Sequence, residues 1–369
     1  MSLTKFLMAW RTTVLPDREV VDALVHPSYA NGSPELAQAL AEWPGVHYWS
    51  REGDGTHLIL TRHLGHARRE RWVLHTLLFL GTLLTTTFAG AVLAGAIPLE
   101  NILDAMSGAT RVPALVAEWA RGLSFSVPLL AILLCHEMGH YITARRYNLD
   151  VSPPYFIPVP LFPWTPVGTL GAFIRLRTLM SDRRQLLDVG AMGPFAGFVV
   201  AVPVLWLGLL GSHPLPGHGP LAGMLVSIGG MDWALGDSLV TLVLRHLVHP
   251  GAQAVLVSPL AFAGWFGLFV TMLNLLPMAQ LDGGHILYAA LPRWHRRIAV
   301  TNLILILALG WLWSGWLLWG TLVLLLSRGR LGHPAVLDSY RPLPRSRTVL
   351  AVAAFVLFVI TFAPVPFRI

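Results

Sequence analysis

Long apolar segments recur along most of this chain, and they constrain its fold more than any other feature. A helix must carry about 20 mostly apolar residues to cross about 30 Å of hydrocarbon. Only 12% of the 369 residues are charged, whereas an ordinary soluble domain carries about 25%. The sequence therefore predicts a polytopic membrane protein. Its apolar segments lie at 72–97, 123–146, 186–211, 259–277, 297–327 and 347–364.

The segment at 297–327 is too long for one untilted span. A tryptophan-rich stretch from Trp311 to Trp316 interrupts it like an interfacial turn, so we expect two helices there and seven spans in total. Residues 1–71 are more polar and contain alternating stretches such as His57–Thr61. We therefore expect an all-α polytopic membrane domain over 72–369, with about six to seven transmembrane helices, preceded by a small cytosolic α+β extension.

Basic residues indicate which ends of the spans face the cytoplasm. They outnumber acidic residues 26 to 19, and they gather in loops beside apolar segments, which is a topology signal rather than a sign of nucleic-acid binding. The four clusters all fall on one side, so we expect a cytoplasmic N-terminus and an external C-terminus. The clustered arginines are Arg68, Arg69, Arg71, Arg145, Arg146, Arg175, Arg177, Arg183, Arg184, Arg293, Arg296, Arg297, Arg328, Arg330, Arg341, Arg345 and Arg347.

Cys135 is the only cysteine, which excludes an intrachain disulfide and a Cys-x-x-Cys metal pair. Any metal must therefore be held by histidine and carboxylate ligands. The first 70 residues lack the apolar core and small-residue cleavage site of a secretory signal peptide. We therefore expect the first span to direct membrane insertion.

The second span ends in a sequence suited to metal chemistry, His136-Glu137-Met138-Gly139-His140. At about 100° per residue, the two histidines lie one turn apart on nearly the same face of a helix. Two imidazoles at this spacing can bind one Zn²⁺, and the adjacent glutamate can reach a metal-bound water as general base. A chance pattern or two packed histidines are the alternatives. A position within lipid favours function, because burying ionisable groups there costs a few kcal/mol or more.

Catalytic zinc sites commonly use three protein ligands, and the fourth span offers the third. Pro277 is expected to break or kink that span, and Gly283 with Gly284 is expected to turn the backbone tightly after Asp282. Taken alone, Asp-Gly-Gly would indicate a cap or a turn. Because the second and fourth spans exit on the same side, however, the histidine pair and Asp282 can lie at one depth, and we expect them to bind one metal ion.

Two further polar residues lie near Asp282. Asn274 lies eight residues before it in an otherwise apolar helix, where an amide without partners is costly. It could bind a peptide carbonyl or stabilise an oxyanion, or it could hydrogen-bond another helix. His285 could contact Asp282 or be an interfacial histidine, and we leave it out of the metal set.

Together these residues resemble the site-2 protease family of intramembrane zinc metalloproteases. Its signatures stand here as His136–His140 and as the Asn-x-x-Pro-x-x-x-Leu-Asp-Gly run from Asn274 to Gly283. The chain looks closest to the bacterial and plastid subgroup that lacks a PDZ domain, and the likeness covers roughly residues 70 to 365. The segments that carry the subgroup likeness are Pro153–Pro158, Gly168–Phe173 and His333-Pro334.

The resemblance implies a three-helix metalloprotease core, which corresponds here to about 123–146, 186–211 and 259–282. It also implies a role for each of five residues. These are zinc ligation by His136, His140 and Asp282, catalysis by Glu137 and an assisting catalytic role for Asn274.

Two supporting segments fit this interpretation. The third span carries a stripe of small residues that permits close contact between helices, and helix packing is the interpretation we prefer for it. Residues 168–177 alternate enough to form a short strand, which could pair with an unwound substrate by β-addition or could be a simple structural hairpin. The members of the stripe are Gly190, Gly193, Pro194 and Gly197.

These features predict a zinc metalloendopeptidase that hydrolyses membrane-protein substrates at or within the bilayer. The expected partners are transmembrane protein substrates and the lipid bilayer, with a homo-oligomer left open, and the expected location is a bacterial inner membrane. The alternative is a membrane zinc transporter or metal-dependent sensor without proteolysis, which would leave Glu137 unexplained. A scaffold that has lost its activity is a third possibility, and the intact ligand set argues against it.

Overall fold

The computed structural model describes most of the chain. His333 and Pro334, which carry part of the subgroup likeness, lie outside the described residues, as do Arg68, Arg69 and Arg341 of the basic clusters. The described segments are 3–14, 18–30, 33–52, 55–63, 70–97, 118–160, 167–177, 180, 182–215, 222–228, 231–332, 336 and 342–368.

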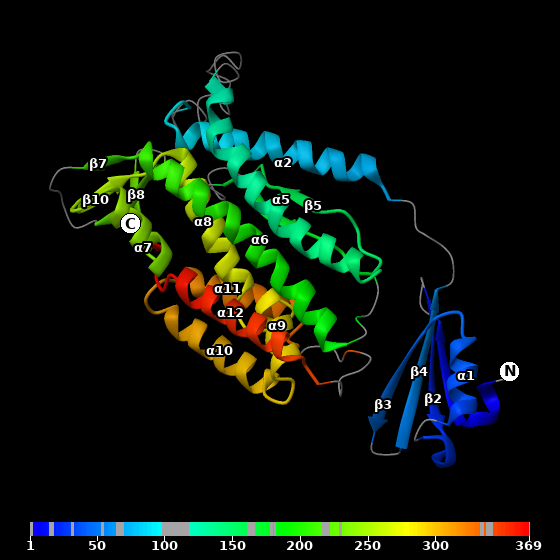
Figure 1. The fold of residues 1–369 in the computed structure, drawn as a ribbon. Coiled ribbons are helices and arrows are strands. Elements are labelled where there is room, and N and C mark those ends of the chain that lie inside the picture. The colour runs from blue at the N-terminus through cyan, green and yellow to red at the C-terminus, as the bar shows by residue number, and fades with distance from the viewer. Residues whose placement is uncertain are drawn as a thin grey trace.

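A four-stranded antiparallel sheet with one helix on its face forms the N-terminal part (Figure 1). The strands pair in the order β1-β2-β4-β3, and the alternating stretch His57–Thr61 lies in β4. Helix α1 is capped by Ser33, whose side chain accepts a hydrogen bond from the Leu36 amide. The elements are η1 (Leu3–Phe6), β1 (Leu7–Val14), β2 (Arg18–Val25), η2 (Pro27–Tyr29), α1 (Pro34–Ala41), β3 (Val46–Glu52) and β4 (Gly55–His63).

Three long helices correspond to the first three predicted spans. They are α2 (Trp72–Leu93), α5 (Leu123–Arg146), which follows the short helix η3 (Ala120–Gly122), and α6 (Arg183–Leu210). Among the described residues, three helices are long and apolar enough to cross a membrane, and these include all of α2, α5 and α6. The chain is therefore mostly helical and membrane-associated.

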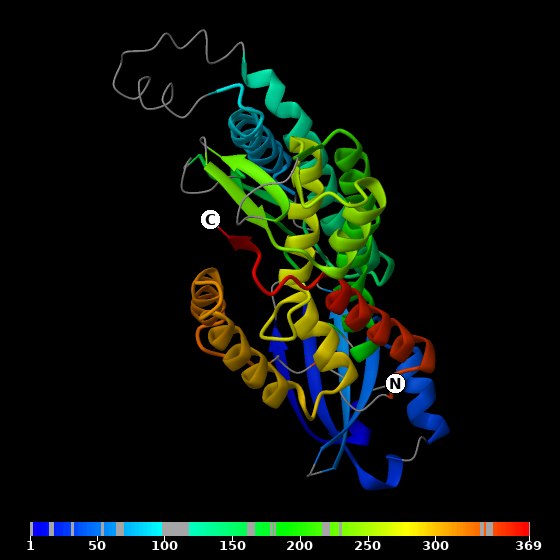
Figure 2. The same cartoon turned by 90° about the vertical axis from the view of Figure 1, so that its left-hand side faces the viewer.

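Five shorter helices complete the region around α6. The apolar segment expected to contain two helices does so, and Trp311 and Trp313 lie in the turn between them. Figure 2 shows α8 and α9, in yellow, between the orange pair α10–α11 and the red α12. The bounds are α8 (Pro259–Asn274), α9 (Asp282–Ala290), α10 (His295–Leu309), α11 (Gly315–Leu326) and α12 (Arg345–Thr361).

We expected one core helix over 259–282, and the prediction is wrong at the C-terminal end of that helix. Helix α8 stops at Asn274, and Asp282 begins a separate helix, α9. Pro277 lies in the break, as expected. The expected tight turn after Asp282 is also wrong, because both following glycines are helical. Their lack of side chains instead lets α9 pack on the break: a Cβ on Gly283 would lie 1.9 Å from the Leu275 carbonyl oxygen.

The sequence missed the regular structure between α6 and α8. Four strands of a five-stranded sheet lie there, and the fifth, β11, comes from the C-terminal end. The order is β11-β9-β8-β10-β7, and the strands are two to six residues long. Three of these strands have only two or three residues, and burial along the other two, β8 and β9, does not alternate. The period-2 signal of a strand is therefore absent. The all-α expectation is thus corrected to a mostly helical fold with added strands. The elements are β7 (His213–Leu215), β8 (Gly223–Ile228), β9 (Met231–Leu235), α7 (Leu239–Val248), β10 (Ala254–Leu256) and β11 (Phe367–Arg368).

Helices α5, α6 and α8 pack against one another around a shared apolar core. Leu133, Leu205 and Phe262 are among its buried members, one from each helix. Between apolar helices in lipid, close backbone contact matters more than the hydrophobic effect. A Cβ on Gly264 would lie 2.4 Å from the Leu205 amide nitrogen. The glycine therefore allows α8 to approach α6 closely.

A two-stranded hairpin lies between α5 and α6 in sequence. Strands β5 (Tyr155–Pro158) and β6 (Thr169–Phe173) pair antiparallel, and β5 packs against α2. The predicted short strand at 168–177 is thus present as β6.

An ion-pair cluster joins the start of α2 to the segment that follows β6. Arg177 donates hydrogen bonds to both carboxylate oxygens of Glu70, at 2.5 and 3.0 Å, and to Asp150 at 3.3 Å. The hydrogen bonds from Arg177 hold the pKa of Glu70 below its ordinary value of 4.5, because the ionised carboxylate is the form that accepts them. Two segments distant in sequence are therefore fixed to each other at the base of α2.

Replacing Glu70 with glutamine should lower the free energy of unfolding at neutral pH by about 1–3 kcal/mol, because charged hydrogen bonds are lost. Since the pKa of Glu70 is depressed in the folded state, this contribution is full above about pH 4.5 and is lost as the pH falls through the folded-state value. Unfolding of the detergent-solubilised protein from neutral to acidic pH measures it. Glu118→Gln, at the exposed Glu118–Arg121 pair, is the matched control and should cost less than about 1 kcal/mol. If E70Q lowers the free energy of unfolding by the same amount in acid as at neutral pH, the contribution does not come from the ionised Glu70 carboxylate.

Candidate metal centre

Helix α5 carries three of the five predicted site residues on its last three turns. His136, Glu137 and His140 are all buried, with exposed fractions of 4%, 6% and 6%. The helix continues to Arg146, so the two histidines are held one turn apart by regular backbone hydrogen bonding. The spacing expected from the sequence is therefore the spacing found.

The break between α8 and α9 brings the fourth predicted residue to the histidines. Residues 275–281 are non-helical, and Ala279 adopts a left-handed φ of 49° that reverses the chain. Asp282 then becomes the first residue of α9. A carboxylate at a helix N-terminus is favourably placed, because the helix dipole is positive there.

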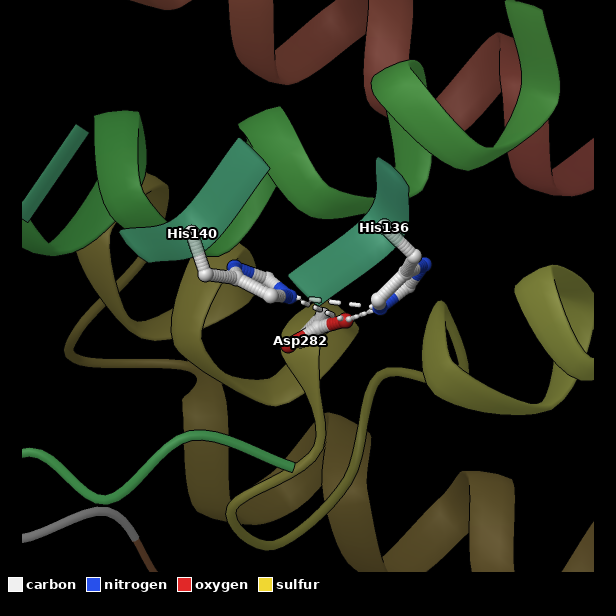
Figure 3. A group of neighbouring side chains, drawn as sticks. All are labelled: His136, His140 and Asp282. Atoms are coloured by element: carbon white, nitrogen blue, oxygen red, sulfur yellow. Dashed lines mark hydrogen bonds and ion pairs between the residues drawn. The ribbon is translucent and has the colours of Figure 1, made fainter. Parts of the chain in front are cut away.

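The two imidazoles and the carboxylate meet at one point (Figure 3). His136 Nε2 and His140 Nε2 lie 3.2 Å apart. The Oδ2 atom of Asp282 lies 3.2 Å from His136 Nε2 and 3.3 Å from His140 Nε2. The structure therefore unites the three residues that the sequence predicted as ligands, although 142 positions separate His140 from Asp282.

The three donor atoms have the spacing that a zinc ion requires. Tetrahedral zinc binds nitrogen and oxygen ligands at about 2.0–2.2 Å, so the ligand atoms themselves lie about 3.3–3.6 Å apart. The observed separations of 3.2, 3.2 and 3.3 Å are close to that value. Among the described residues, His136, His140 and Asp282 form a cluster that could hold a metal ion. Three protein donors leave one tetrahedral position open.

A backbone carbonyl on α6 orients one of the imidazoles. His140 Nδ1 donates a hydrogen bond of 2.6 Å to the carbonyl oxygen of Val189. This contact places the proton on Nδ1 and leaves the lone pair of Nε2 directed at the cluster, which is how outer contacts prepare a histidine to bind metal. No side-chain pattern could have revealed it, because the acceptor is a main-chain atom.

The small-residue stripe of α6 lies directly against the histidines. A Cβ on Gly193 would fall 2.0 Å from His140 Nε2, and one on Gly197 would fall 3.2 Å from the Cβ of His136. Helix packing is part of its role, since a Cβ on Gly139 of α5 would meet the Met192 carbonyl oxygen at 2.3 Å. The packing interpretation was nevertheless incomplete, because Gly193 also provides the space that the His140 ring occupies.

Glu137 and Asn274 lie beside the same cluster. The carboxylate of Glu137 interacts electrostatically with His136, His140 and Asp282, and it accepts a hydrogen bond from the backbone amide of Ile174, just after β6. The amide nitrogen of Asn274 lies 3.2 Å from His136 Nε2. All five predicted residues are thus gathered at one place.

Comparisons with known proteins agree with this geometry. The profile of Peptidase family M50 matches residues 124–310, about half of the chain. The protein described as "Probable zinc metalloprotease EGY1, chloroplastic" from Arabidopsis thaliana is 34% identical over 172 residues, which cover 46% of this chain and 29% of that protein. The one described as "Probable zinc metalloprotease EGY2, chloroplastic" from the same organism is 29% identical over 252 residues, covering 67% and 42%.

The similarity is limited to part of these relatives, because the chain spans less than half of their length. No solved structure matches the chain. The family match nevertheless includes α5, α6, α8 and α9 and every residue of the candidate centre. The chain therefore belongs to peptidase family M50, the site-2 protease family that its sequence resembles.

Proposed function

We propose that this protein is an intramembrane zinc metalloendopeptidase of the site-2 type, with His136, His140 and Asp282 as the metal ligands. One observation carries the proposal: three donor atoms with tetrahedral spacing lie beside a buried glutamate on the helix that supplies two of them. Zinc, when bound, supplies Lewis acidity that polarises a scissile carbonyl and makes water easier to deprotonate. The names of the relatives, probable zinc metalloproteases, support the choice of metal.

Glu137 is the general base in this mechanism. Its carboxylate takes a proton from the attacking water and then donates it to the leaving nitrogen, which is the role of the glutamate in a His-Glu-x-x-His helix. The Ile174 amide, which hydrogen-bonds this carboxylate, fixes its direction. Asn274 assists by offering its amide to the scissile peptide. Its distance of 3.2 Å to a ligand nitrogen supports that role.

The substrates we propose are transmembrane helices with a stretch that unwinds. A peptide bond within a helix is hidden by backbone hydrogen bonding, so helix-breaking residues near the cut expose it. The hairpin β5–β6 ends beside Glu137, and Leu170 on β6 is 68% exposed. Strand addition of an unwound substrate to β6 is one role for this hairpin, and structural support of α5 is the other.

We further propose six to seven spans with a cytoplasmic N-terminus, in a bacterial inner membrane. Three contacts support one common cytoplasmic end: Arg177 with Glu70, Arg347 with Asp188 and Arg183 with the Ala289 carbonyl oxygen. They join the ends of helices that the arginine clusters predicted to lie on one side. The relatives described above are chloroplast proteins, so a plastid membrane is the competing location.

Residues 1–71 and 72–369 are proposed as two domains. The N-terminal sheet and α1 enclose their own apolar core, which includes Phe6, Leu36 and Leu58. The helices that carry the centre pack around other clusters. A separate core is what an independently folded unit requires.

Replacing Glu137 with glutamine should abolish cleavage of a single-span reporter while zinc content persists. The ligands are untouched, but the base is lost, and such groups contribute about 100- to 10,000-fold to the rate. Zinc analysis and reporter cleavage by the purified full chain, with and without chelator, measure both properties. Glu118→Gln, at an exposed ion pair, is the control.

Retained proteolysis by E137Q would refute the assignment of Glu137 as the general base. A wild-type protein that binds zinc, cleaves no supplied helix and transports zinc into proteoliposomes would instead support the zinc transporter or sensor.

Replacing Gly193 with alanine should weaken zinc binding about 10- to 100-fold, the loss that disturbed ligand orientation typically causes. The new Cβ would fall 2.0 Å from His140 Nε2, so the ring must move away from the metal. Zinc dissociation constants from competition with a chelator test this. Gly211→Ala, whose Cβ would meet its nearest neighbour at 3.7 Å, should bind zinc normally. Unchanged affinity in a folded G193A protein would contradict the ligand assignment.

A further inference from the structure

A cavity of about 730 Å³ with charged, aromatic and apolar lining residues lies where α9 ends and α6 begins. Two guanidinium groups line it from different elements, Arg183 of α6 and Arg293 after α9, and the rings of Tyr288 and Trp294 complete its wall. Arg183 donates a hydrogen bond of 3.4 Å to the Ala289 carbonyl oxygen, which holds its guanidinium against α9. The lining residues that the structure describes include two arginines and no acidic residue.

The chemistry of this cavity suits a phosphate at a membrane surface. Guanidinium groups bind phosphate oxygens through paired hydrogen bonds, and tryptophan and tyrosine are enriched at the level of lipid headgroups. With two arginines and no acidic residue among its described lining residues, the cavity carries a positive charge that attracts an anion.

An apolar groove of about 360 Å³ continues from this cavity between α9 and α12. Ala290 and Leu291 line both spaces, so the two adjoin. The outer wall of the groove is open, because Val352 and Phe355 of α12 are 57% and 63% exposed. Other lining residues include Ile286, Leu287 and Phe358.

We propose that the cavity and the groove together bind one anionic phospholipid, with its phosphate between Arg183 and Arg293 and an acyl chain along the groove. A charged head next to an apolar channel matches this ligand, and basic pockets between membrane helices on the cytoplasmic side are suited to such headgroups. An apolar substrate helix fits less well, because it offers no anionic group to the two arginines of the cavity.

The site lies against the helix that carries Asp282. Gly283, the next residue, lines the groove, and α9 extends from there to the headgroup cavity. A ligand that binds the folded state stabilises it, so phospholipid bound here stabilises the position of α9. This inference concerns lipid binding and holds whether or not the protein is a protease.

Native mass spectrometry of the detergent-purified full chain tests the site directly. Phosphatidylglycerol should bind more tightly than phosphatidylcholine with the same acyl chains. Arg183→Gln and Arg293→Gln should each weaken phosphatidylglycerol binding about five-fold, the contribution of one basic residue near a lipid surface. Arg296→Gln removes an exposed arginine three residues from Arg293 that does not line the cavity, and it should change the affinity less than two-fold, about the scatter between independent surface sites.

A second pair of variants tests the groove without changing charge. Val352→Trp fills it, and phosphatidylglycerol binding should weaken. Val349→Trp, on the same helix but outside the groove, is the matched control and should bind normally. Three outcomes would overturn the proposal: equal binding of both lipids, equal loss in the R296Q control, or displacement of phosphatidylglycerol by inorganic phosphate alone. Displacement by a single-span peptide, with no preference between the lipids, would assign the groove to protein substrates instead.

Discussion

The structure depends on holding two imidazoles and one carboxylate in contact inside a bundle of apolar helices. Groups of this kind are costly in hydrocarbon unless each finds a partner. Here each of the three donor atoms lies 3.2 to 3.3 Å from the other two. Much of the surrounding fold can be understood as the means of bringing Asp282 to a pair of histidines that α5 already places together.

Helix α6 shapes the centre, although none of the three clustered residues comes from it. Gly193 leaves room for the ring of His140, and the Val189 carbonyl accepts a hydrogen bond from Nδ1 of that ring. The residue before Val189 is fixed in turn, because Asp188 accepts hydrogen bonds from Arg347 at 2.8 Å and from the hydroxyl of Tyr147. Contacts at the ends of α5, α6 and α12 therefore converge on the segment that orients one ligand.

The sequence was sufficient to predict which three residues cluster at the centre and insufficient to predict their surroundings. The His136–His140 motif and Asp282 could be predicted because their chemistry depends on residue type and spacing, and the structure brings them together. The boundary between α8 and α9 was predicted only in part. Pro277 indicated a break, but whether Gly283 and Gly284 turn or pack depends on the backbone of Leu275, which the sequence does not place.

Other features had no usable sequence signal. The five-stranded sheet consists of strands that are two or three residues long or whose burial does not alternate, and the contact that orients His140 ends on a main-chain oxygen. The stripe of small residues was visible in the sequence. That Gly193 also makes room for a histidine ring depends on which side chain of α5 faces the stripe. Residue type and local spacing therefore predicted the chemistry that each residue could perform. Which residues meet in space was decided by tertiary contacts that the sequence does not show.

X-ray absorption at the zinc edge, on the purified full chain loaded with one equivalent of metal, tests the centre most directly. We expect four nitrogen or oxygen donors at about 2.0–2.2 Å with two imidazoles among them, and we expect Asp282→Ala to lose one oxygen donor and weaken binding. A spectrum that is identical in wild type and D282A, or that contains sulfur, would contradict a site built from His136, His140 and Asp282.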